Sequence, residues 1–247
     1  MAKIIAYPLS AIYYFAFGLL LVIFHPIQWI CFNLFGYKAH KTSVEVLNFG
    51  LMNCLLLLGS YVVFRNPYKL ATDRPSIIVA NHQSMYDIPP IIWHLRKIHP
   101  KFISKKELGK GIPSVSYNLR HGGSVLIDRK NPGQAIREIL KISAYAEKNN
   151  RSVVIFPEGT RSRTGKIKTF QRRGLKTLID RMPHAQIIPI SINNSWKTQR
   201  YGSFPMGIGN RITFDIHEPV LVGSMSTDEL IDLTEKMVIS GVKDRTN

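Results

Sequence analysis

A histidine and an aspartate that could form a catalytic pair follow an apolar run. Residues 76–80 lead directly into Asn81-His82-Gln83-Ser84-Met85-Tyr86-Asp87. A carboxylate bound to one imidazole nitrogen fixes the tautomer and raises the basicity of the other nitrogen. On a continuous helix His82 and Asp87 would point about 140° apart. The pair therefore requires a bend after the strand, and the two prolines after Asp87 suit the start of a helix there. A surface histidine beside a helix-capping aspartate is the alternative.

A second polar turn follows another apolar run, Val153–Phe156, and reads Pro157-Glu158-Gly159-Thr160-Arg161-Ser162. Ligands of α/β sheets bind beyond the carboxyl ends of the strands. In that position Glu158 could hold a substrate hydroxyl and Arg161 could hold a phosphate. The same residue types are also common in solvated turns.

Two more basic residues, Lys105 and Arg129, stand where predicted strands end. Together with Arg161 they could converge on one anion, although each alone is compatible with an ordinary surface charge. The sequence has no G-x-S-x-G nucleophile elbow and no H-E-x-x-H zinc motif, and its glycine-rich segment 159–166 lacks P-loop spacing. These patterns predict neither a serine nucleophile nor a metal site.

Runs of β-branched residues alternate with helical patterns from residue 70 onward. This alternation predicts an α/β fold with a mixed, mostly parallel sheet flanked by helices. The predicted strands are 76–80, 101–104, 124–128, 152–156, 186–193 and 211–216, and the predicted helices are 88–98, 107–119, 133–148, 171–181 and 227–242.

The first 64 residues are much more apolar than the rest. The stretch Ile4–Phe24 has no charged residue and as a helix would be about 32 Å long, which matches the hydrocarbon core of a bilayer. Pro26 should end or kink this helix. A second apolar stretch, Val44–Phe64, carries a few polar residues along one side. Residues 1–66 are therefore predicted to form a two-helix membrane-anchoring element, and residues 67–247 the α/β domain.

Basic residues lie between the two apolar stretches, and they conflict mildly with the positive-inside tendency if both helices span the bilayer. The sequence therefore favours a pair of helices sunk into one leaflet. One spanning helix, or two buried helices of a soluble core, are the alternatives.

The charge balance indicates a polyanionic partner. Lys plus Arg number 33 and Asp plus Glu number 16, which gives a net charge of +17. Such a surplus fits nucleic acid, an anionic membrane or a phosphorylated substrate. The hydrophobic fraction of 45% excludes a disordered chain. Only two cysteines are present, which argues against a disulfide framework or a cysteine metal cluster.

Four ordered segments resemble the motifs of the glycerolipid acyltransferases. Asn81–Asp87 looks like the N-H-x4-D motif, and Gly123–Arg129 is similar to G-x-x-F-I-D-R with Leu126 in the phenylalanine position. Phe156–Ser162 matches F-P-E-G-T-R-S, and Ile187–Ile190 resembles the fourth, apolar motif. The bacterial 1-acyl-sn-glycerol-3-phosphate acyltransferases resemble the chain most, since they share its short length and apolar N-terminus.

The resemblance implies acyl transfer without a covalent intermediate. His82 would act as general base on the sn-2 hydroxyl of lysophosphatidic acid, and Asp87 would orient His82. The hydroxyl would attack the thioester of acyl-CoA or of acyl-acyl-carrier protein, and phosphatidic acid would form. No cofactor and no metal are implied beyond the thioester co-substrate.

The resemblance also assigns binding roles and a location. Glu158, Gly159 and Thr160 would position the glycerol, whereas Lys105, Arg129 and Arg161 would bind the phosphate. The expected partners are the lipid bilayer, lysophosphatidic acid and the acyl donor, without nucleic acid, at the cytoplasmic face of the inner membrane. Other acceptors, namely glycerol-3-phosphate, another lysophospholipid or a lyso-aminolipid, and a non-catalytic anion-binding module, are the alternatives.

Overall fold

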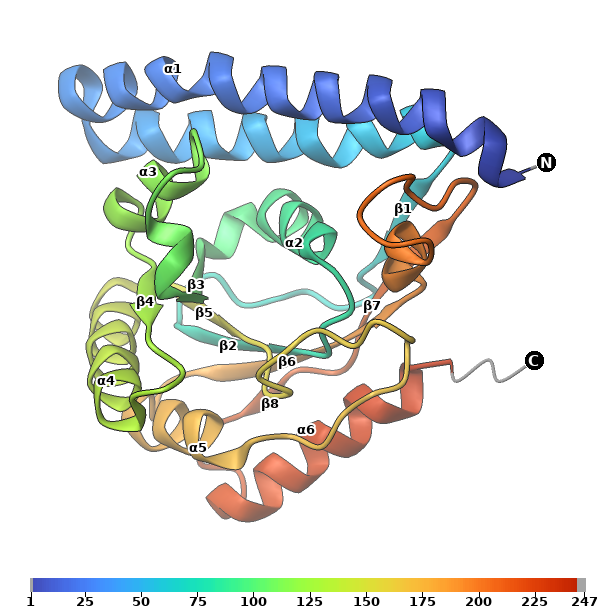
Figure 1. Ribbon diagram of the computed structural model, residues 1–247. Helices are drawn as coiled ribbons and strands as arrows, with labels where there is room; N and C mark the ends of the chain where they lie inside the picture. Colours follow the sequence, from blue (N-terminus) through green and yellow to red (C-terminus); the bar gives the residue numbers. More distant parts are fainter. Residues whose placement is uncertain (1, 244–247) are drawn as a thin grey trace.

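A mostly parallel sheet of eight strands forms the centre of the protein (Figure 1). The computed structural model describes residues 2–243. The strand order is β1-β7-β6-β2-β5-β3-β4, with β8 beside β6, and β6 is antiparallel to both β7 and β8. The strands are β1 Tyr61–Arg65, β2 Ser76–Ala80, β3 Pro100–Lys105, β4 Val125–Ile127, β5 Ser152–Ile155, β6 Gln186–Asn193, β7 Arg211–Ile216 and β8 Val220–Leu221. The mixed, mostly parallel α/β fold is thus confirmed.

Helices cover both faces of the sheet. One face packs against α4 Pro132–Asn149, α5 Arg172–Arg181 and α6 Thr227–Gly241, and the other against α1 Ala2–Asn53 and α2 Ile88–His94. Strands β2, β5 and β6 are buried on both faces, as parallel strands between two helical layers must be. Short 3₁₀ turns lie at Cys54–Leu58, Met85–Asp87, Arg96–Ile98, Lys106–Gly109 and Ser195–Gln199.

The helix predicted over 107–119 is wrong in its extent. The chain forms a 3₁₀ turn at Lys106–Gly109 and resumes as α3 at Val115–His121. Gly111 has φ +82° and Pro113 follows it, so the intervening residues cannot continue an α-helix.

Helix α1 folds back on itself as a hairpin of two antiparallel legs, drawn in blue in Figure 1. The turn lies at Gly36, which has φ 76° and ψ −170°, between the two predicted apolar stretches, whereas the end or kink predicted at Pro26 does not interrupt the helix. The helix continues through Pro26 because α3 supports the turn before it. Ser114 donates its hydroxyl to the Leu21 carbonyl at 2.7 Å and its amide to His25 Nδ1 at 3.1 Å. These bonds tie the turn before Pro26 to the residue that precedes α3.

The second leg is shorter than the predicted stretch 44–64. It ends at Asn53, the 3₁₀ turn follows, and residues 61–65 then pair in parallel with β7 as strand β1. The sequence placed this strand in the N-terminal element because its apolar residues directly continue those of the helix. The division of the chain near residue 66 stays a prediction.

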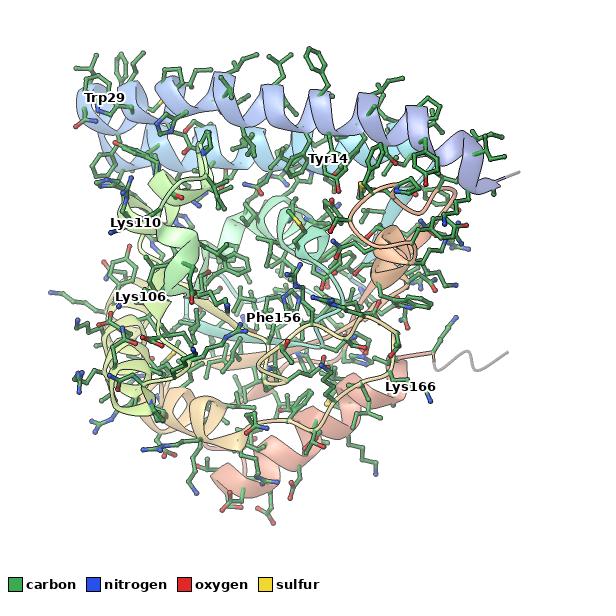
Figure 2. The ribbon with its side chains drawn as sticks, in the orientation of Figure 1. Tyr14, Trp29, Lys106, Lys110, Phe156 and Lys166 are labelled. Atoms are coloured by element: carbon green, nitrogen blue, oxygen red, sulfur yellow. The ribbon has the colours of Figure 1, made fainter. Side chains whose placement is uncertain are left out.

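The hairpin has one buried and one exposed apolar side. Tyr13 and Val44 are 0% and 7% exposed and pack in the core with residues of β2 and α2. On its other side Phe15, Leu34 and Phe35 are each more than two-thirds exposed. Tyr14 and Trp29 also belong to the hairpin (Figure 2). The hairpin is therefore part of the protein core and also presents a large apolar surface to its surroundings.

We expect Tyr13→Ala to lower the free energy of unfolding by about 3–5 kcal/mol, because the ring is fully buried against Phe17 and Tyr86. Tyr13→Phe keeps the ring and should change the free energy of unfolding by less than about 1.5 kcal/mol. Denaturant unfolding of both variants in neutral detergent measures the difference. Equal stability of the two variants would show that the hairpin does not contribute to the core.

Candidate active site

His82 and Asp87 form the predicted pair. The Nδ1 atom of His82 lies 2.8 Å from Oδ2 of Asp87. The carboxylate accepts, so Nδ1 carries the hydrogen and Nε2 presents a lone pair. The His82 side chain is 14% exposed, and its Nε2 makes no hydrogen bond to residues 2–243. The pair thus leaves one basic nitrogen available to a ligand.

The bend that this pair requires comes from helix capping. Ser84 has extended backbone angles and caps the 3₁₀ turn Met85–Asp87. Its hydroxyl accepts from the amide of Tyr86 at 3.0 Å, and the Asp87 carboxylate reaches back to the amide of Ser84 at 3.0 Å. Helix α2 then begins with prolines in its first positions. This capping box turns the chain sharply enough for Asp87 to face His82.

The Asp87 carboxylate is fully buried and has four donors. Oδ2 accepts from His82 Nδ1, from the amide of Gln83 at 2.8 Å and from the amide of Ser84. Oδ1 accepts from the hydroxyl of Ser195, on the 3₁₀ turn that follows β6. Several charge-assisted hydrogen bonds offset the cost of burying this carboxylate and fix its orientation.

Sequence reasoning missed Ser195, because it lies more than 100 positions after Asp87. It is fully buried, and its amide donates to Gln83 Oε1 at 3.0 Å. Asn81 forms a similar link, since its side-chain amide binds both the carbonyl and the amide of Ile192, at 2.9 and 2.7 Å. Asn81 and Gln83 flank His82 inside the recognised motif. These two polar side chains were the signal in the sequence that the motif makes hydrogen bonds to another segment of the chain.

The turn after β5 holds the main chain of His82 from both sides. Glu158 accepts the amide of His82 at 2.7 Å, and the amide of Ser162 donates to the His82 carbonyl at 2.7 Å. The imidazole ring stacks on Phe156, with centroids 4.1 Å apart and planes 18° apart. Phe156 is near the middle of Figure 2. The two motifs therefore form one rigid unit at the carboxyl ends of β2 and β5.

Glu158 is only 5% exposed and uses both carboxylate oxygens for main-chain amides. Oε1 binds His82, and Oε2 accepts from the amide of Lys168 at 2.9 Å. Burial raises the pKa of Glu158, whereas the two amides lower it. Gly159, at φ +68°, donates its amide to the Phe156 carbonyl and makes the tight turn beside it. Thr160 follows this turn and is exposed.

The basic residues predicted to bind phosphate lie at or after the carboxyl ends of the strands, as His82 does. Lys105 pairs in register with Ile127, so the ends of β3 and β4 are adjacent just before Arg129. Partial burial lowers the pKa of Arg129, Glu107 raises it, and the nearby charge of Arg161 lowers it. Arg129, Arg161 and Lys105 are exposed, and Lys105 forms an ion pair with Glu107 at 3.8 Å. The arrangement can attract an anion close to His82.

Comparison with known families identifies the architecture. A family model described as Acyltransferase matches residues 61–193, which is more than half of the chain. This chain belongs to the acyltransferase family. The acyltransferase match includes both strand ends that carry His82 and Glu158.

A solved structure has a similar fold over nearly the whole acyltransferase. The crystal structure of the 1-acyl-sn-glycerophosphate (LPA) acyltransferase PlsC from Thermotoga maritima aligns with a TM-score of 0.81 and 29% identity. The alignment covers 98% of this chain and 96% of that chain.

Curated relatives carry the name 1-acyl-sn-glycerol-3-phosphate acyltransferase. The Saccharomyces cerevisiae protein is 27% identical over 217 residues, 86% of this acyltransferase and 64% of the yeast protein. The Cocos nucifera protein is 33% identical over 67% of this chain and 49% of its own length. The Helicobacter pylori protein is 37% identical over 49% of each chain. The chain thus spans between about half and two-thirds of these relatives.

We expect Ser195→Ala to lower the rate of acyl transfer by roughly 10- to 100-fold, since a hydrogen bond to a charged group contributes about 1.5–3 kcal/mol. KM should change little, because Ser195 acts through Asp87. Without this donor the carboxylate stabilises the His82 imidazolium more strongly, so the acidic limb of the pH–rate profile should move to higher pH.

Ser240→Ala, at an exposed position on α6, is the matched control and should leave the rate and the profile unchanged. A rate loss in Ser195→Ala with an unchanged pH profile would show that Ser195 only supports the fold.

Proposed function

We propose that this acyltransferase moves an acyl chain from a thioester, either acyl-CoA or acyl-acyl-carrier protein, to the sn-2 hydroxyl of 1-acyl-sn-glycerol-3-phosphate. The product is phosphatidic acid. The observation that carries the proposal is the His82–Asp87 pair, whose Nε2 has no protein partner among residues 2–243 and lies at the same sheet edge as three basic residues. The printed names of the relatives support the choice of acceptor.

In the proposed mechanism His82 is the general base. Nε2 takes the proton of the acceptor hydroxyl while the hydroxyl oxygen forms a bond to the thioester carbonyl carbon. The tetrahedral intermediate then collapses, the carbon–sulfur bond breaks, and the thiolate takes the proton from Nε2. Asp87 stabilises the transient imidazolium and holds its orientation. The steps balance without an enzyme-bound acyl group and without a metal or cofactor.

The acceptor phosphate is proposed to bind Arg129 and Arg161, with Lys105 at the periphery. Guanidinium groups suit this role because they bind phosphate oxygens in a bidentate manner. Glu158 and Gly159 shape the turn, and the exposed Thr160 is proposed to contact the glycerol. Glu158 can still accept from a substrate hydroxyl, because each carboxylate oxygen has a second lone pair.

Membrane attachment is proposed to occur through the α1 hairpin, with its exposed apolar side sunk into one leaflet at the cytoplasmic face. In the most apolar stretch of this helix only 11% is buried within the protein, which is low for a helix in the core of a soluble protein. The net charge of +17 favours an anionic membrane surface. This attachment would present the active site to an acceptor that itself resides in the leaflet.

Thiol release from palmitoyl-CoA, with lysophosphatidic acid or glycerol-3-phosphate added in parallel, tests the reaction. We expect release only with lysophosphatidic acid, and phosphatidic acid as product. His82→Ala should lower the rate by about 10²–10⁴-fold, the contribution of a general base. Activity at the wild-type rate in His82→Ala would show that another group takes the proton. Thiol release with glycerol-3-phosphate but not with lysophosphatidic acid would show that glycerol-3-phosphate is the acceptor.

We expect Arg129→Gln and Arg161→Gln each to raise KM for lysophosphatidic acid by roughly 10-fold or more, because each removes a charge-assisted bond to phosphate. Arg173→Gln, an exposed position on α5, makes the same charge change away from the site and should leave KM unchanged. Initial rates at varied acceptor concentration distinguish these outcomes. Equal KM values in all three variants would place the phosphate elsewhere.

A further inference from the structure

Lys101, on strand β3, is a buried lysine without an acidic partner. It is 7% exposed, and its Nζ forms no hydrogen bond or ion pair with residues 2–243. Its Nζ lies over the ring of Tyr37, 5.1 Å from the ring centroid. Burial, together with the charges of Arg151 and Lys41, lowers the pKa of Lys101 to about 8, although Glu45 opposes the shift. Burial of a charged ammonium is costly unless an anion accompanies it or the group loses its proton.

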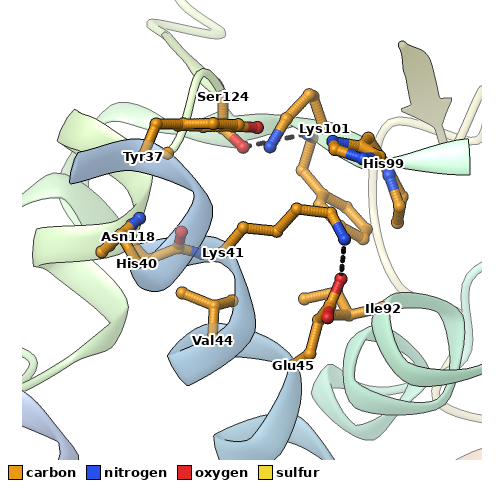
Figure 3. Close-up of a pocket in the computed structure, with 13 residues that line it drawn as sticks. Tyr37, His40, Lys41, Val44, Glu45, Ile92, His99, Lys101, Asn118 and Ser124 are labelled. Carbon is orange, nitrogen blue, oxygen red and sulfur yellow. Dashed lines mark hydrogen bonds and ion pairs between the residues drawn. The ribbon is translucent and has the colours of Figure 1, made fainter. Parts of the chain in front are cut away.

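Lys101 lines a cavity of about 30 Å³ between the second leg of the α1 hairpin and the start of β3 (Figure 3). The hairpin contributes Tyr37, His40, Lys41 and Glu45. Strand β3 contributes Lys101, and His99 and Ser124 come from just before β3 and β4. Arg151 adds a further cation, 6.0 Å from the centroid of the same Tyr37 ring. The one carboxylate of the wall, Glu45, already forms an ion pair with Lys41. Positive charge therefore exceeds negative charge around the cavity.

Four other polar atoms in this region are buried without a hydrogen-bond partner in the described part of the chain. They are Tyr37 Oη, which lies near the Tyr145 hydroxyl, His40 Nε2, His99 Nδ1 and Arg151 Nε. Buried polar atoms are nearly always paired, so a cluster of unpaired ones indicates a missing group. Tyr37 Oη and Arg151 Nε are hydrogen donors, as is the Lys101 ammonium. The missing group must therefore offer several acceptor atoms and a negative charge.

This cavity is distinct from the candidate active site. His82 follows the carboxyl end of β2, whereas Lys101 and Ser124 stand at the beginnings of β3 and β4. Strands β2, β5, β3 and β4 are parallel. The candidate active site lies at their carboxyl ends and the cavity at their amino ends, roughly 15 Å apart for a strand of five residues.

The cavity also lies close to the apolar surface of the hairpin. Its wall begins at Tyr37, one residue after the Gly36 turn, and the two residues before that turn, Leu34 and Phe35, are 68% and 71% exposed. A group that enters the cavity from the membrane side would therefore come from the headgroup layer next to the hairpin tip.

We propose that this cavity binds a phosphate group, supplied by the headgroup of an anionic phospholipid in the leaflet that holds the hairpin. Phosphate oxygens would accept from Lys101, Arg151 and Tyr37 and neutralise the excess positive charge. The volume corresponds to about two water molecules, which admits the phosphate oxygens and excludes a bulky headgroup. Bound lipid would join the hairpin to β3 and couple membrane composition to the stability of the fold.

The test is thermal unfolding of the full chain in phosphatidylcholine vesicles with and without phosphatidylglycerol. Phosphatidylglycerol is chosen because it is neither substrate nor product of the proposed reaction, so the result does not depend on that reaction. We expect it to raise the Tm of the wild-type protein by roughly 5 °C, the effect of a ligand well above its Kd. An unchanged Tm would overturn the proposal.

Lys101→Met tests the site itself, and Lys236→Met, at an exposed position on α6, is its matched control. Lys101→Met should abolish the shift and should unfold at a higher temperature than wild type in pure phosphatidylcholine, because it removes an uncompensated buried charge. Lys236→Met should retain the shift. A full shift in Lys101→Met, or a lower Tm for it in phosphatidylcholine, would overturn the proposal.

Tyr37→Phe removes a single donor and keeps the ring, so it should reduce the shift without abolishing it. Inorganic phosphate added to phosphatidylcholine vesicles distinguishes the source of the group. A smaller shift with inorganic phosphate than with phosphatidylglycerol supports the lipid. An equal shift with inorganic phosphate overturns the lipid as source, and an equal shift with chloride overturns phosphate as the ligand.

Discussion

The buried carboxylate of Asp87 is the constraint on which the candidate active site depends. A carboxylate with no exposure to water is costly unless every oxygen has donors, and here four donors surround it. Two of them are the main-chain amides that set the bend after β2, one is His82, and one is Ser195 from beyond β6. The hydrogen bonds to this carboxylate therefore fix three features together. They fix the backbone turn after β2, the tautomer of His82, and the position of the turn after β6 relative to the end of β2.

The sheet topology brings the remaining groups to the same place. Strands β2, β5, β3 and β4 run parallel, so the turns that carry His82, Glu158, Lys105 and Arg129 all emerge at one edge. Glu158 then ties its turn to the amide of His82, while Phe156 supports the imidazole ring. Hydrogen bonds to the main chain fix this geometry, which suits the proposed role of His82 as a general base acting on a positioned hydroxyl.

The α1 hairpin connects one face of the sheet to the surroundings of the protein. Its inner side completes the core through Tyr13 and Val44, whereas its outer side exposes large apolar residues. Its second leg also closes the cavity around Lys101, where cations and unpaired donors gather. An element that is at once core, apolar surface and cavity wall offers a direct physical route by which the lipid environment could influence the folded domain.

The sequence by itself determined the fold class and the two motif turns. The bounds of β2, β6 and β7 were predicted as observed, since buried parallel strands read as short β-branched runs. The sequence also placed His82 and Asp87 at a strand end, where local capping by Ser84 decides their geometry. Strand β1 was missed because its apolar residues continue those of the preceding helix, and the first helix was predicted to end or kink at Pro26, although it continues to the turn at Gly36. Only the tertiary structure revealed Ser195 as a partner of Asp87, the capture of Glu158 by main-chain amides, and Lys101 as an unpaired buried cation. These three depend on contacts between distant segments, and side-chain type and spacing carry no information about which distant group neutralises a buried charge.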